Sequence, residues 1–576
     1  MEKVPHELSQ VERLSPSTPE SPSTSPLAQL EQTWSEIQVG HQGSYSIERL
    51  KLLQEYCNRT SVTRALLVCL LTPVPTLLVA VLLECLPLRS PAEGWSANWM
   101  FWIRLSLTEF IVIGVGSWQL DLFVPGHKFS LCQQFSLTLA ICLAQMGTFM
   151  LEAVVVGFPV PFMWQFATPT LGIYIPVLTR LIYGPSLFVK GSRLQQHFTN
   201  FQETVLMNLT VTGIFPFCRV LYNLLPPGYR GVVVIILPFW KFGARWFAVR
   251  MSRQVEDFIP ELVAFSVDFF SSLFISVCMS TSGSFYLTAL FMVIDLVHLL
   301  VKFRGVCSQE RVLLRLFQDK EDSVIKPKEV SQKIDSVELI TTLVGIIRDP
   351  NVTSLKRIRL RANPPHIISE QLSEFLQTLE ASGKFSARNM SVNTTVSFSD
   401  TPSHRLSRWM FHCASVVPAH VVPTSAPGLT TGVHSFRDDS SGQLVLNGLQ
   451  LLFYCEYMVL VEYIECVVPF VYLAYQSALE QLPNVVYYPG VGEWGMTAVT
   501  NLLVFAVLKV GPLVLVHVFL LRKFAFSPLH QLAFVLETQF YAVQTTLFTL
   551  MIFALHYQLA HLGVDFTFRF EWLRSQ

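Results

Sequence analysis

The stretch LVEYIECVVP, residues 460–469, lies in the middle of an apolar run that predicts a membrane-spanning helix over 450–474. A helix needs about 20 consecutive apolar residues to cross the hydrocarbon core of a bilayer, and this run is long enough. Glu462 and Glu465 are three residues apart, so both carboxylates project from one side of the helix. A charged side chain costs about 2.5–3.5 kcal/mol at the centre of a membrane helix. The pair therefore predicts that this side of the helix faces other helices and not lipid.

The composition is typical of a protein with many such helices. Of 576 residues, 51% are hydrophobic and 14% are charged, as in polytopic membrane proteins. Lys plus Arg and Asp plus Glu are equal at 41 each, so no net charge favours a nucleic-acid partner. The 11 cysteines form no CxxC pair, and His404, His412, Cys413 and His420 match no standard metal-site spacing. The chain therefore predicts no disulfide framework, no metal site and no cofactor.

The predicted fold is an all-α integral membrane protein with about eleven transmembrane helices. Runs of suitable length lie near 64–86, 99–120, 135–156, 161–183, 204–225, 232–250, 258–280, 284–302, 450–474, 494–520 and 534–557. Spans one to eight then occupy residues 47–302, and spans nine to eleven occupy 448–558. The segment 303–447 separates the two groups.

The distribution of Lys and Arg predicts the orientation. With the N-terminus in the cytoplasm, most cations near span ends fall on the cytoplasmic side, among them Lys128, Lys190, Arg245, Lys302 and Arg522. This bias places the N-terminus and 303–447 in the cytosol and the C-terminal tail 559–576 outside. The bias in Lys and Arg does not indicate in which cellular membrane the protein lies. Three glycosylation sequons in the cytosolic segment, at Asn351, Asn389 and Asn393, are then predicted to carry no glycan.

A shift of 396 residues aligns the first span with the ninth. Pro73 then matches Pro469, and LECLP at 83–87 matches LEQLP at 479–483 without a gap. We therefore predict up to three four-helix repeat units of parallel orientation, the last one incomplete.

The first 46 residues are predicted to be a disordered cytosolic tail rich in Ser and Pro. Four side chains precede a proline and are candidates for proline-directed phosphorylation: Ser15, Thr18, Ser21 and Ser25.

The cytosolic segment 303–447 is predicted to contain a small α/β module over about 330–382, followed by a flexible stretch over 383–440. Helical periodicity covers 330–347 and 367–379. Between these runs, SLKRIRLRA at 354–362 alternates apolar and basic residues, which predicts a strand with one basic face. This face is interpreted as a solvated surface. The alternative is that the segment docks onto anionic lipids of the inner leaflet or onto cytosolic proteins.

Six ionisable residues inside predicted spans form the candidate polar site: Glu462, Glu465, Asp268, Asp295, Lys509 and Arg104. One interpretation is that the acids line a path for cations or protons. The other is that they pair across helices and stabilise packing, with Lys509 or Arg104 as the partners of the two glutamates. Pattern alone does not decide between them.

The block YCEYMVLVEYIECVVPFVYLAYQSALEQLP, the span LLVCLLTPVPTLLVAVLLECLP and the closing GVDFTFRFEWL resemble a family of eukaryotic multi-pass membrane proteins described only by their transmembrane segments. The resemblance covers most of the chain outside the N-terminal tail. It implies a multi-pass fold and no known activity, substrate or site residue.

Function is expected to be that of a transporter or a channel-like solute pathway. The alternative is a non-transporting membrane scaffold or receptor that acts through its cytosolic segments. We expect no enzymatic activity, because no GxSxG arrangement occurs.

Overall fold

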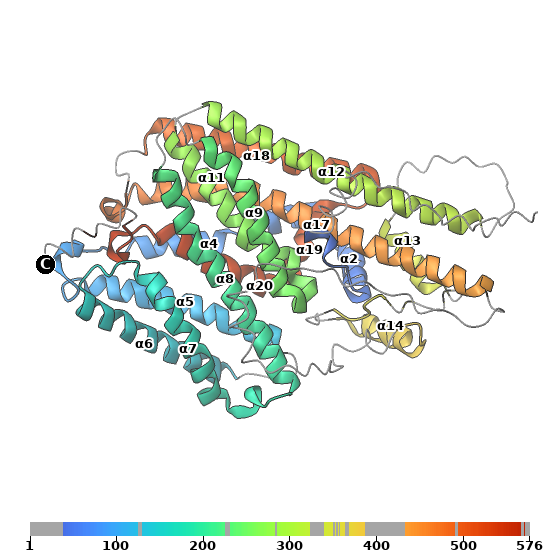
Figure 1. Ribbon diagram of the computed structural model, residues 1–576, viewed down its shortest axis with the longest axis horizontal. Coiled ribbons are helices and arrows are strands. Elements are labelled where there is room, and N and C mark those ends of the chain that lie inside the picture. The colour runs from blue at the N-terminus through green and yellow to red at the C-terminus, as the bar shows by residue number, and fades with distance from the viewer. Residues whose placement is uncertain are drawn as a thin grey trace, which may run out of the picture.

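The structure is a computed structural model that describes residues 39–124, 130–224, 231–282, 285–322, 339–349, 352, 355, 357–362, 368–385, 432–489, 494–565 and 570. All regular secondary structure within these residues is helical, so the predicted all-α class is confirmed. Figure 1 shows that some of the long helices run along the longest axis of the molecule and that others cross it at a steep angle. Ser15, Thr18, Ser21, Ser25, the sequons at Asn351, Asn389 and Asn393, and the His404–His420 group lie outside the described residues.

The first part of the chain contains α2 (Ile47–Arg59), α3 (Val62–Leu71), α4 (Val74–Glu84), α5 (Trp99–Phe123), α6 (Leu131–Val156), α7 (Met163–Tyr183), α8 (Arg193–Leu224) and α9 (Gly231–Ser252). A broken helix follows, made of η5 (Arg253–Phe258), α10 (Ile259–Val263), the π-helical turn η6 (Ala264–Asp268) and α11 (Phe269–Ser282). The remaining helices are α12 (Phe285–Asp322), α13 (Leu339–Arg348), α14 (Glu370–Ala381), α17 (Gly432–Leu479), α18 (Met496–Phe524), α19 (Pro528–Thr538) and α20 (Phe540–His556).

Six helices in the described part of the chain are long and apolar enough to cross a membrane. They are Val62–Glu84, Trp99–Leu120, Leu131–Val156, Val255–Ser280, Ser441–Leu479 and Met496–Phe524. A seventh span results if α19 and α20, which are bent by 81° at their junction, count as one. The other four predicted spans fall on α7, α8, α9 and α12, which are helical but are not among these six.

The broken helix and α17 occupy the centre of the bundle. The most apolar part of the broken helix is entirely buried, and that of α17 is 72% buried. In contrast, α3 exposes large apolar side chains such as Val62, Leu67 and Leu70. Exposed apolar surface on this scale is typical of a face that contacts lipid or another protein. The helices at the centre are thus shielded by helices whose outer faces are apolar.

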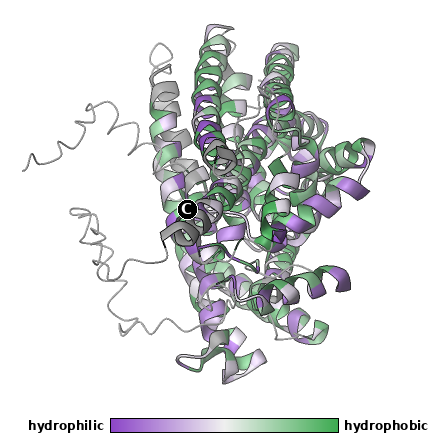
Figure 2. Cartoon of the chain, turned by 90° about the vertical axis from the view of Figure 1, so that its right-hand side faces the viewer, coloured by the Kyte–Doolittle hydropathy of each residue, from purple (hydrophilic) through white to green (hydrophobic). Residues whose placement is uncertain are grey.

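Two long helices cross the predicted domain boundaries. α12 continues unbroken to Asp322, and α17 begins at Gly432. Of the stretch 383–440 predicted to be flexible, residues 432–440 belong to α17 and residues 386–431 lie outside the described residues. At the end where these helices extend furthest lie α2, α13 and α14 (Figure 1). The end-on view in Figure 2 shows hydrophilic and hydrophobic residues side by side there.

The predicted disorder of the N-terminal tail is wrong for residues 39–46. Val39 and Tyr45 are buried, and the Tyr45 amide donates to the Leu449 carbonyl of α17 at 3.3 Å. The aromatic ring of Tyr45 supplies the apolar area that holds this short segment against the bundle.

The predicted strand at 354–362 is also wrong within the described residues 357–362, which form turns and bends. The alternation is real, because Ile358, Leu360 and Ala362 are buried. However, the Arg359 and Leu360 carbonyls accept hydrogen bonds from the Ile47 and Glu48 amides in the first turn of α2. The segment thus satisfies the free N–H groups of a helix start and does not pair with another strand. The α/β module is not confirmed.

The two segments of the predicted repeat touch each other. Asn484, just after LEQLP, donates to the carbonyls of Glu84 and Leu86, both at 2.7 Å, and accepts from the Leu88 amide. The aligned prolines differ in their structural setting. The helix is interrupted at Pro73, between α3 and α4, whereas α17 continues through Pro469. The repeat therefore stays a prediction.

Candidate functional site

Glu465 of α17 is the centre of a buried charge cluster. Its Oε1 lies 2.8 Å from Lys241 Nζ of α9, and its Oε2 lies 2.9 Å from Lys509 Nζ of α18. Lys509 also pairs with Asp295 of α12. Lys241 Nζ is 3.4 Å from Asp268 Oδ1 at the end of the π-helical turn. One carboxylate of α17 therefore connects three neighbouring helices and the broken helix.

Glu462, one helical turn before Glu465, has its own cation. Its Oε1 lies 2.8 Å from Lys302 Nζ of α12. Arg245 of α9, one turn after Lys241, pairs with Asp268. The common face of the two glutamates therefore points into the bundle, as predicted from their spacing.

We call these eight residues the central charge cluster: Lys241, Arg245, Asp268, Asp295, Lys302, Glu462, Glu465 and Lys509. Four acids face four bases, so the cluster is neutral overall. Asp268 is fully buried, and Glu462, Glu465 and Lys509 are at most 8% exposed. Each paired charge is costly to bury and is stabilised by its counter-ion.

Of the six residues proposed from sequence, five lie in this cluster and Arg104 does not. Arg104 of α5 pairs with Glu84 at the end of α4, and the Glu84 carboxylate also accepts from Tyr475 at 2.9 Å and from Tyr488 at 2.5 Å. Arg104 as a partner for the two α17 glutamates is therefore wrong. The network around Arg104 involves Tyr475 near the end of α17, whereas Glu462 and Glu465 lie earlier in that helix.

Sequence reasoning missed three cations of the cluster, Lys241, Arg245 and Lys302. Arg245 and Lys302 were assigned to the cytoplasmic side in the orientation argument, but both are paired in the bundle. Helical spacing contained the signal, since Lys241 and Arg245 are four apart and Asp295 and Lys302 are seven apart.

A second buried network lies near α2. Arg49 of α2 pairs with Glu261 of α10 at 2.7 Å and with Glu456 of α17 at 2.8 Å. Glu456 also accepts from Tyr45. All four side chains are at most 3% exposed, so this network joins residues 45–49 to both central helices.

Arg359 attaches the 357–362 segment to the beginning of the broken helix. Its Nη1 lies 2.8 Å from Asp257 Oδ2, and its Nε lies 3.3 Å from Glu256 Oε2. Burial alone lowers the pKa of the Arg359 guanidinium, but the neighbouring carboxylates of Asp257 and Glu256 raise it above its ordinary value. The guanidinium is therefore a permanent cation at this junction.

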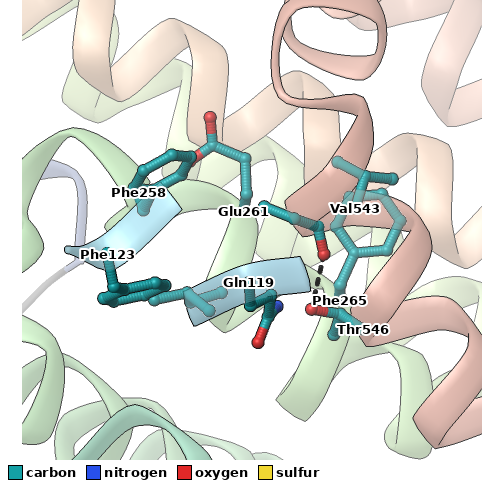
Figure 3. Close-up of a pocket in the computed structure, with 9 residues that line it drawn as sticks. Gln119, Phe123, Phe258, Glu261, Phe265, Val543 and Thr546 are labelled. Carbon is teal, nitrogen blue, oxygen red and sulfur yellow. Dashed lines mark hydrogen bonds between the residues drawn. The ribbon is translucent and has the colours of Figure 1, made fainter. Parts of the chain in front are cut away.

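Two interrupted helices meet beside Glu261. The broken helix changes from 3-10 to α and then to π geometry between Arg253 and Asp268, and α19 and α20 meet at an 81° bend. A hollow of about 10 Å³, roughly the room for one water molecule, lies between them and α5. Figure 3 shows its lining residues, among them Gln119, Phe123, Phe258, Glu261, Phe265, Val543 and Thr546.

Several buried polar atoms next to these helices have no hydrogen-bond partner among the described residues. They include Glu261 Oε2, Asp268 Oδ2 and the Tyr457 hydroxyl. Buried polar groups without a partner are rare in folded proteins and mark places where water or a ligand binds. Within the described ranges, no group of three or more His, Cys, Asp or Glu side chains is placed to hold a metal ion.

The described residues form a helical bundle with several helices long and apolar enough to span a membrane and with buried, paired charges. No family model, curated protein or solved structure matches this chain.

Proposed function

We propose that this protein provides a pathway for a small solute across a membrane, as a transporter or a channel-like protein. The observation that carries the proposal is the meeting of two interrupted helices at the hollow beside Glu261. Interrupted helices at membrane depth occur where freed backbone groups line a cavity or a solute site. The π-helical turn adds to this, because such turns are frequent at functional sites.

The central charge cluster has a structural role in this proposal. Because its charges balance in pairs, it holds α9, α12 and α18 around α17 and presents no unpaired charge to a permeating ion. The solute pathway runs instead on the other side of the broken helix, past Glu261 and Gln119. This assignment favours the packing interpretation for Glu462 and Glu465.

The proposed topology has eleven spans, with the N-terminus and 303–447 in the cytosol. The four helices beyond the six to seven candidates span the membrane in this arrangement. Its support is that α2, α13 and α14 lie together at one end of the bundle (Figure 1), as expected for segments on one side of a membrane. The three-unit repeat belongs to the same proposal and is supported by the 396-residue match alone.

A scaffold or receptor function is the second candidate. It is favoured by the contact of Arg359 with Asp257 and Glu256, which connects the segment outside the spans directly to the broken helix. A partner that binds this segment would act on the centre of the bundle through that contact.

Filling the hollow tests the solute pathway. Thr546 of α20 lines the hollow, and a larger side chain there obstructs it. We expect Thr546→Met to reduce uptake of labelled solutes (amines, amino acids, sugars and nucleosides) into vesicles containing the purified full chain at least tenfold. Thr199→Met is the matched control, because Thr199 is exposed on α8. Absence of uptake of every solute by the unmodified protein would contradict transport of these classes and favour the scaffold.

A further inference from the structure

A larger cavity lies between α5, α6, α7, α8 and α20. Its main part has a volume of about 110 Å³, and a second part of about 60 Å³ adjoins it. The two parts share lining residues, among them Val112, Leu171 and Thr549. The main part also shares Gln119 and Thr546 with the hollow beside Glu261. The three spaces thus form one series from α7 to the broken helix.

Glu109 of α5 lines the smaller part and is 5% exposed. No hydrogen bond or ion pair to its carboxyl occurs among the described residues, in contrast to the paired acids of the central charge cluster. A lone carboxylate at this depth is costly unless it is protonated or meets a cation. Glu109 is therefore a carboxyl aimed into a cavity without a protein counter-ion.

The surroundings of Glu109 are rich in aromatic rings and in unsatisfied acceptors. Phe149, Trp164 and Phe553 line the same part of the cavity, and Trp164 and Phe553 meet edge to face at 5.2 Å. Gln165 Oε1 and Thr212 Oγ1 have no hydrogen-bond partner there. An ammonium group supplies donors for such oxygens, and aromatic faces attract cations.

The larger part offers an apolar chamber. Ile113, Leu137, Ile141 and Ile175 contribute to its walls. An engineered cavity of about 150 Å³ takes benzene, so a chamber of this size suits a body of a few carbon atoms up to a small ring.

We propose that this cavity binds a small protonated amine, with its ammonium group on Glu109 and its apolar body in the chamber between α5, α6 and α7. The inference deepens the solute pathway by naming its substrate class, and transport by this site rests on that proposed function. Binding itself does not depend on it.

Other ionisable groups on the neighbouring helices do not neutralise Glu109. Cys142 of α6 interacts with it and is an uncharged thiol. Arg104, five residues earlier on α5, is held by Glu84. His556 of α20 contacts Glu84 at 3.2 Å and the Ala80 carbonyl at 3.2 Å. The negative charge of Glu109 is thus left for a ligand.

Calorimetric titration of the purified full chain with benzylamine and with benzyl alcohol tests the proposal at pH 7, where the amine is protonated and the alcohol is neutral. We expect the amine to bind at least tenfold more tightly than the alcohol of similar shape. Glu109→Gln should remove this difference. Glu480→Gln, a partly exposed carboxylate at the end of α17, should retain it.

Three results would overturn the proposal. One is equal affinity for amine and alcohol in the unmodified protein, a comparison that needs no variant to fold. Another is amine binding that survives Glu109→Gln in protein with an unchanged melting temperature. The third is binding of neither probe, expected if Glu109 carries only a proton. Amine binding without uptake into vesicles would instead contradict the solute pathway and leave the binding site standing.

Discussion

Glu465 lies between two lysines and forms an ion pair with each of them. Removing it leaves Lys241 and Lys509 with only Asp268 and Asp295 as partners inside the bundle. Breaking a buried ion pair from one side costs about 3–5 kcal/mol, because the remaining charge stays buried without compensation.

We therefore expect Glu465→Gln to lower the melting temperature of the purified protein markedly, and the double variant Glu465→Gln with Lys509→Met to lower it by less than the sum of the two single changes. A double-mutant cycle measures the coupling. Glu480→Gln serves as the control. Additive effects in the cycle would show that the pair does not interact.

His561, just after α20, is a buried neutral imidazole. Its Nε2 lies 2.7 Å from the Arg89 carbonyl, and its ring stacks on Phe101. Burial lowers the pKa of His561 to about 4, whereas the unfolded chain has a value near 6.5.

Because the folded pKa is depressed, the unfolded state takes up a proton first as the pH falls, and stability is lost between about pH 6.5 and pH 4. Above pH 6.5 the group has no pH-dependent effect. We expect the melting temperature of His561→Gln to fall less steeply than that of the unmodified protein over this range. Parallel pH profiles would contradict the assignment.

At the scale of elements, the start of α2 depends on a segment more than 300 residues away. The Ser46 hydroxyl caps α2 by accepting a hydrogen bond from the Arg49 amide, and the Arg359 and Leu360 carbonyls accept from the Ile47 and Glu48 amides. The position of that segment depends in turn on the ion pairs of Arg359 with the broken helix.

We expect Arg359→Gln to increase hydrogen exchange at the amides of Ile47 and Glu48, since the carbonyls that protect them are no longer held in place. Arg357→Gln is the matched control, because Arg357 is exposed in the same segment. Unchanged protection in both variants would mean that the buried Ile358 and Leu360 alone hold the segment.

For the whole molecule, the proposed topology concerns which segments lie together at each end of the helical bundle. α2, α13 and α14 lie at one end of the bundle (Figure 1). Elsewhere, Asn484 in the segment after α17 forms hydrogen bonds with Glu84 at the end of α4 and with Leu88 in the turn that follows. In the proposed arrangement of eleven spans, the odd number would place the N-terminus and the C-terminus on opposite sides of the membrane.

In sealed vesicles with the cytosolic face inside, we expect an epitope tag at the N-terminus, or one inserted within 386–431, to bind antibody only after permeabilisation. A C-terminal tag should bind antibody without permeabilisation. Antibody binding before and after permeabilisation measures this. A glycan on Asn351, Asn389 or Asn393 would contradict the orientation.

The sequence by itself determined the helical membrane class and the inward direction of Glu462 and Glu465, because apolar run length and helical period are local properties of the chain. Only the tertiary structure decided which cation meets which acid. Lys241, Lys302 and Lys509 come from three different helices, and Arg104 was assigned to the wrong partner because depth along the bundle is not visible in spacing. The tertiary structure also placed the alternating segment at 357–362 against the start of α2, and it brought Glu109 to a cavity formed by five helices. Such contacts depend on packing between distant segments, which no local pattern contains.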